Sequence, residues 1–164
     1  MRKLIALLVV FVLVFSCSFL LASACGNGEP VDINLEGTKE GDVVYCEGLA
    51  FEKVSDSCIN SPITRTTSEG FSVSNFGGNT SMNKVLTLNS TYRYFRILVK
   101  NEGSGNIKVD IGGIYTTSIG PGSMYIYSTK AWSAKSYTVS FSCDSGMYGS
   151  ASAMLCTTLA EAEP

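Results

Sequence analysis

Residues 137–143 read YTVSFSC, and residues 107–111 read IKVDI. In both stretches every second side chain is apolar, and the side chains between are polar or small. Because successive side chains of a β-strand point to opposite faces, this period of two predicts strands with one buried and one solvated face. These stretches decide the fold class, since no stretch of useful length with a helical period follows residue 24.

On both sides of these two stretches, short β-rich runs recur between clusters of Gly, Asn, Ser and Asp, which favour turns. About eight to ten strands at this spacing predict an all-β domain, an antiparallel β-sandwich of immunoglobulin-like or jelly-roll-like type. The further runs lie at residues 43–46, 49–54, 63–67, 71–74, 84–88, 92–100, 114–119 and 124–128.

The stretch from Tyr92 to Cys143 combines a strand, an Asn-Glu-Gly turn, a strand, a Pro-Gly turn and two more strands. In this patterning it resembles the immunoglobulin-like sandwiches of bacterial surface proteins. The resemblance covers about a third of the chain and lacks the Cys…Trp…Cys spacing of true immunoglobulin domains. It implies a sandwich fold.

The N-terminus has the three parts of a secretory signal peptide. Arg2 and Lys3 form a basic start, an apolar stretch follows, and residues 22–24 read ASA, small side chains that suit a signal peptidase. The alternative is an uncleaved anchor, because residues 4–24 are long enough to span a bilayer as a helix. We expect a signal peptide at residues 1–24, a flexible tether or loosely attached first strand at 25–42, the sandwich domain at 43–157 and a disordered tail at 158–164.

Residues 21–25, LASAC, resemble the lipobox of bacterial lipoproteins, in which a cysteine after small residues is acylated and becomes the mature N-terminus. The match is incomplete, since the family prefers Leu at the place of Ala22. The resemblance implies a lipid on Cys25 and contact with a membrane only through the signal or this anchor. Plain secretion is the alternative.

Four cysteines follow Cys25, and an even number in an exported chain indicates two disulfides. Local pairing joins Cys46 to Cys58 across a turn, and Cys143 to Cys156 across the final hairpin. The other two connectivities stay open. Zinc is disfavoured, because these spacings lack close C-x₂₋₄-C pairs.

Composition excludes several kinds of catalytic site. The 164 residues include no histidine, so Ser-His-Asp and Cys-His systems and His-ligated metals are impossible. Without Arg2 and Lys3, ten basic residues stand against fourteen acidic ones, which predicts no nucleic-acid partner. Asp32, Asn34 and Glu36 place oxygen atoms at alternate positions but lack the glycine and spacing of a calcium loop, so no metal or other cofactor is predicted.

Aromatic residues form the candidate binding site. Rings on a flat sheet face can stack on sugar rings, although ordinary cross-strand packing of tyrosines is the alternative. The alternation turns Tyr125 and Tyr127 away from the core and places Tyr92 and Tyr94 on one face, while Trp132 lies in a polar connection. The predicted contact residues are Tyr125, Tyr127, Trp132, Tyr92 and Tyr94.

The sequence as a whole predicts an exported bacterial module, secreted or held at the cell surface, with a binding or structural role. Its expected partner is a glycan or another cell-surface component, in weak contact, and it is not expected to be an enzyme. The alternative is a small extracellular hydrolase that uses carboxylates from the acid-rich first third of the chain.

Overall fold

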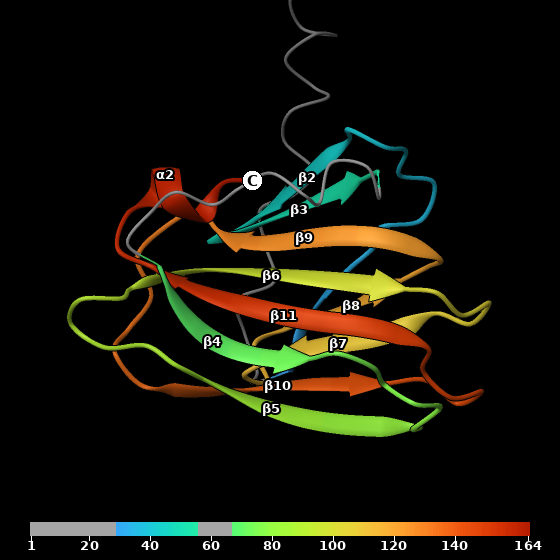
Figure 1. Ribbon diagram of the computed structural model, residues 1–164. Coiled ribbons are helices and arrows are strands. Elements are labelled where there is room, and N and C mark those ends of the chain that lie inside the picture. The colour runs from blue at the N-terminus through green and yellow to red at the C-terminus, as the bar shows by residue number, and fades with distance from the viewer. Residues whose placement is uncertain (1–28, 56–66) are drawn as a thin grey trace, which may run out of the picture.

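The computed structural model describes residues 29–55 and 67–164 of the chain. Within these ranges the strands form two packed sheets, five strands in sheet A and six in sheet B (Figure 1). The prediction of an all-β sandwich is therefore confirmed. The predicted signal peptide, Cys25 and Cys58 lie outside the described residues.

Sheet A has the strand order β1-β8-β7-β10-β5, and sheet B has the order β2-β3-β9-β6-β11-β4. The described strand pairs are antiparallel, apart from the parallel pair of β1 and β8. The bounds in sheet A are β1 (Val31–Ile33), β5 (Ser81–Thr87), β7 (Ile107–Ile111), β8 (Tyr115–Ile119) and β10 (Ser136–Ser142). In sheet B they are β2 (Val43–Cys46), β3 (Leu49–Val54), β4 (Ser68–Val73), β6 (Tyr94–Asn101), β9 (Gly122–Ser128) and β11 (Gly149–Cys156).

The two stretches of strict alternation form β7 and β10, which are neighbours in sheet A. Their apolar side chains Ile107, Val109, Ile111, Val139 and Phe141 are buried between the sheets. The polar side chains between them face outward. Burial of each large apolar side chain contributes about 1.5–3 kcal/mol to the stability of the fold. The alternation places these side chains on one face of each strand, so their burial stabilises the packing of the two sheets.

Connections after β4 mostly cross from one sheet to the other, as β10 to β11 does. An exception is the β7–β8 hairpin, whose turn residues Gly112 and Gly113 have φ of 66° and 68°. Left-handed backbone of this kind favours glycine, and the Gly113 N–H donates to the Asp110 carboxylate at 2.9 Å. The final hairpin predicted between Cys143 and Cys156 is wrong, because β10 and β11 belong to different sheets.

Both ends of the described chain form regular secondary structure, although the sequence predicts a tether or loosely attached strand at one end and a disordered tail at the other. Within residues 25–42, β1 pairs with β8, and the Thr117 hydroxyl donates to the Ile33 carbonyl at 2.8 Å. Ile33 and Leu35 are buried in the core, which explains why this segment is held. In residues 158–164, where the sequence predicts disorder, helix α2 (Leu159–Ala162) forms instead.

Candidate binding surface

The outer face of sheet B carries three of the five predicted contact residues, together with Tyr45. We call the surface around Tyr45, Tyr94, Tyr125 and Tyr127 the tyrosine face. The strand register aligns one row across it: Tyr45, Ala50, Tyr127, Arg96 and Met154. The next row consists of Val43, Glu52, Tyr125, Leu98 and Ser152.

Tyr45 and Tyr127 form the centre of the first row. Tyr45 is 66% exposed, whereas Tyr127 is 4% exposed. The small Ala50 lies between them in the row, which leaves room for the two tyrosine side chains to approach each other. Burial, and then the neighbouring Tyr45 and Glu52, raises the pKa of Tyr127 above its usual range. Tyr127 is therefore a neutral floor beside the exposed Tyr45 ring.

Arg96 holds Tyr125 in place from the neighbouring strand. The guanidinium carbon lies 5.3 Å from the centre of the Tyr125 ring, a cation–π contact. Arg96 is only 8% exposed, and its Nη1 donates to the Glu163 carbonyl at 2.9 Å. Because burial and this hydrogen bond hold the guanidinium in position, it supports the half-buried Tyr125 ring from the neighbouring strand.

Helix α2 closes part of this face. It contacts β11, β6 and β9, and Figure 1 shows it beside the end of sheet B. Ala162 is fully buried in a cluster with Ala50, Tyr127 and Cys156. The Glu161 carboxylate holds the start of the helix, since it accepts hydrogen bonds from the backbone N–H and the hydroxyl of Thr157, both at 2.8 Å. The chain thus covers one end of the tyrosine face and leaves Tyr45 exposed.

The same covering determines the state of Cys156. Burial raises the pKa of this thiol to about 11; nearby Glu161 adds to the shift and Arg96 opposes it. The thiol also donates to the Glu161 carbonyl at 3.4 Å. Because the thiolate is the reactive form of cysteine, Cys156 is a protonated, unreactive part of the packing at neutral pH.

Tyr92 does not belong to the face. Strand β6 begins at Tyr94, so the alternation of that strand does not extend back to Tyr92. Tyr94 packs in the cluster under α2, whereas Tyr92 packs against the core between the sheets. The prediction that the two rings share a face is wrong for this reason.

Trp132 is a core residue, and the prediction that it forms part of the contact surface is also wrong. It is 7% exposed and lies between β9 of sheet B and β10 of sheet A. Its ring packs edge-on against Phe95 from sheet B and Tyr137 from sheet A, with ring centres 5.0 Å apart in both pairs. Strand periodicity ends with β9, so it carries no information about a ring in the crossing between sheets.

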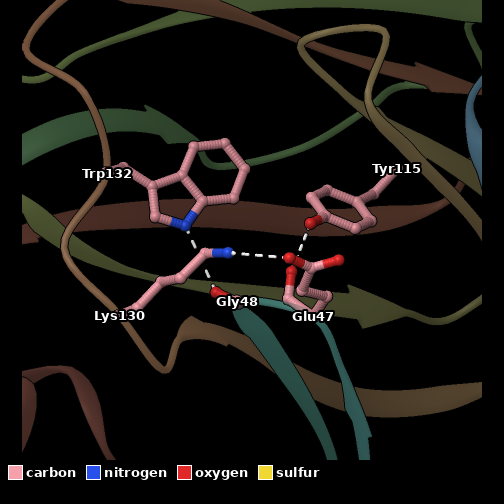
Figure 2. A network of polar contacts seen from close by, with 5 residues as sticks. All are labelled: Glu47, Gly48, Tyr115, Lys130 and Trp132. Carbon is pink, nitrogen blue, oxygen red and sulfur yellow. Dashed lines mark hydrogen bonds and ion pairs between the residues drawn. The ribbon is translucent and has the colours of Figure 1, made fainter. Parts of the chain in front are cut away.

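The polar edge of Trp132 supports the tight turn between β2 and β3, as Figure 2 shows. The indole N–H donates to the Gly48 carbonyl at 3.2 Å, and the Tyr115 hydroxyl donates to the Glu47 carbonyl. Lys130 and Glu47 add an ion pair of 3.5 Å, which contributes little because both side chains are largely exposed. Two rings of the core thereby position the turn that follows Tyr45.

The described cysteines form no disulfide with one another: Cys46, Cys143 and Cys156 carry free thiols. The pair Cys143–Cys156 is wrong on geometric grounds. Cys143 lies in the connection before β11, and Cys156 is the last of the eight residues of that strand. Eight extended residues span about 25 Å, far more than the roughly 7 Å allowed between bridged Cα atoms. The partner predicted for Cys46, Cys58, lies outside the described residues.

Residues 29–55 and 67–164 contain neither a metal-binding cluster nor a membrane-spanning helix. In this part of the chain no three acidic or cysteine side chains gather where they could hold a metal ion. Nor does any helix there have the length and apolar character needed to cross a bilayer. Comparison with known proteins gave no match to a family model, a curated protein or a solved structure.

Proposed function

We propose that this chain is an exported binding module that contacts carbohydrate through its tyrosine face. The observation that supports this best is the pair of accessible rings, Tyr45 and Tyr125, on neighbouring rows of one sheet face. A sugar ring presents CH groups on its flat side, which pack on aromatic rings, and hydroxyl groups at its edge. A flat surface of rings suits the first, and polar groups beside it suit the second.

The polar partner in this surface is Glu52, directly opposite Tyr125 in the register. Burial raises the pKa of the Glu52 carboxyl, which indicates that its surroundings are partly shielded from water. A carboxylate in such surroundings is a strong acceptor for sugar hydroxyls. Each ring contact adds only about 0.5–1.5 kcal/mol, so we expect weak binding that depends on several contacts or copies.

Export and surface attachment are part of the same proposal. They are supported by the sequence of residues 1–25, namely the signal pattern and the lipobox-like Cys25. A weakly binding module benefits from being held at a surface, because attachment raises the effective concentration of the binding face near its ligand.

Sedimentation of the purified protein with insoluble polysaccharides, such as cellulose, chitin and peptidoglycan, tests the proposal. Tyr45→Ala and Tyr125→Ala should each reduce retention about threefold to tenfold, because each removes one ring contact. The matched control is Tyr148→Ala, a tyrosine that is 53% exposed but lies in the β10–β11 connection, away from the tyrosine face. This control should bind like the wild type.

Two results would contradict the proposal. One is a lack of retention on every polysaccharide. The other is retention that Tyr148→Ala weakens as much as Tyr45→Ala does, since binding would then not depend on this face. Thermal melting of each variant shows whether the fold is retained.

A further inference from the structure

A cleft of about 540 Å³ opens beside the β8–β9 connection. Residues 32–38 form one wall, residues 118–124 form the opposite wall, and Lys53 and Asn106 complete the lining. Its volume lies in the range of about 300–1,000 Å³ that is typical of small-molecule sites. The lining also includes the buried apolar side chains of Ile33, Leu35, Ile119 and Met124.

Lys53 is the unusual member of the lining. In β3 it follows Leu49 and Phe51 at alternate positions, so it lies on the side of the strand that faces the core. Its Nζ donates to the Thr38 carbonyl at 3.3 Å, and its two other N–H groups have no partner among the described residues. A half-buried ammonium with free donors is thus directed into the cleft.

The rim of the cleft supplies the complementary groups. Glu36 is an exposed carboxylate of the lining, in the turn after β1. The side-chain carbonyl of Asn34 accepts the backbone N–H of Glu36 at 2.8 Å, which leaves its amide donors available. A charged acceptor, a charged donor and an amide therefore line the cleft beside buried apolar side chains.

We propose that this cleft binds a small, neutral, polyhydroxylated molecule such as a monosaccharide or disaccharide. The carboxylate of Glu36 repels anions, and the ammonium of Lys53 repels cations. A hydroxyl group both donates and accepts, so a ligand built from hydroxyls can satisfy every polar group of the lining. Binding in the cleft is independent of binding at the tyrosine face, because Lys53 and the neighbouring Glu52 lie on opposite sides of sheet B.

The experiment is a titration of the full purified chain, labelled with ¹⁵N, with neutral hexoses, N-acetylhexosamines and their disaccharides. Backbone amides of residues 34–38, 118–120 and 122 should shift in a saturable way. Lys53→Met keeps the apolar stem and should weaken binding about tenfold, because a charge-assisted hydrogen bond is lost. Lys39→Met, which removes the same charge from an exposed site outside the cleft lining, should leave the affinity unchanged. Glu36→Gln and the exposed Glu40→Gln form a second matched pair.

Each result is decisive for the cleft alone. Saturable shifts at residues 34–38 whose affinity Lys53→Met lowers about tenfold support it, whatever the polysaccharides show at the tyrosine face. Shifts confined to Tyr45 and Tyr125 would overturn it while supporting the proposed function. Tighter binding of a sugar carboxylate than of its neutral parent, or equal affinity in Lys53→Met and the wild type, would also overturn it.

Discussion

The outer faces of the two sheets are built on the same alternation and have opposite character. On sheet B, the rows hold tyrosines, a buried arginine and a covering helix. On sheet A, the corresponding row reads Asp32, Thr116, Asp110, Ser140 and Asn83, and the strands around it add mostly serine and threonine. The alternation therefore shows which side chains point away from the core. The chemistry of those side chains indicates whether the face is covered by water or by other groups.

The difference also shows where burial continues outside the core. Arg96 and Tyr127 point away from the interior, yet both are almost inaccessible because α2 and neighbouring rings cover them. Lys108, which points outward from sheet A, is exposed. Sheet B thus has packed layers on both of its sides, and substitutions on its outer face should affect stability as well as binding.

The largest expected effect belongs to the ring that joins the two sheets. Trp132→Ala removes contacts with Phe95 and Tyr137 and the hydrogen bond to Gly48, so it should lower the free energy of unfolding by about 3–5 kcal/mol. Urea denaturation measures this loss. A loss of polysaccharide retention with unchanged stability would instead place Trp132 in the binding surface and break the distinction between core and face.

An intermediate effect should separate the two outer faces. Arg96→Ala loses a charge-assisted hydrogen bond and the contact with Tyr125, and it should destabilise the protein by about 2 kcal/mol. Lys108→Ala, its exposed counterpart on sheet A, should change stability by less than about 0.5 kcal/mol. Equal losses in chemical denaturation would show that sheet B carries no additional packed layer.

The smallest effect compares two threonines on opposite sides of β8. The buried Thr116 hydroxyl finds no hydrogen-bond partner within the described part of the chain, whereas the Thr117 hydroxyl donates to Ile33. Thr116→Val should therefore stabilise the protein by about 1 kcal/mol, because it removes an unsatisfied buried group. Thr117→Val should destabilise it by about the same amount. Differential scanning calorimetry would show melting temperatures shifted in opposite directions; a shift in the same direction contradicts the assignment.

Sequence reasoning succeeded where the chain is regular. The alternation in residues 107–111 and 137–143 predicted two strands and their buried sides, and that in residues 124–127 turned Tyr125 and Tyr127 outward as observed. That the two strands are neighbours came only from the structure. It missed Tyr45, the most exposed ring of the face, because a four-residue strand is too short to show a clear period. The cleft was also missed, since its walls come from segments far apart in the chain.

The all-β class, the inward and outward sides of the long strands and the absence of histidine chemistry follow directly from residue types and their local spacing. Tertiary structure alone decided that Trp132 is buried, that Cys143 and Cys156 lie at opposite ends of β11, and that Lys53 faces a cleft. The physical reason is that these properties depend on which sheet receives each strand. Crossings between sheets are set by long-range burial of apolar surface, which leaves no periodic trace in the connecting residues.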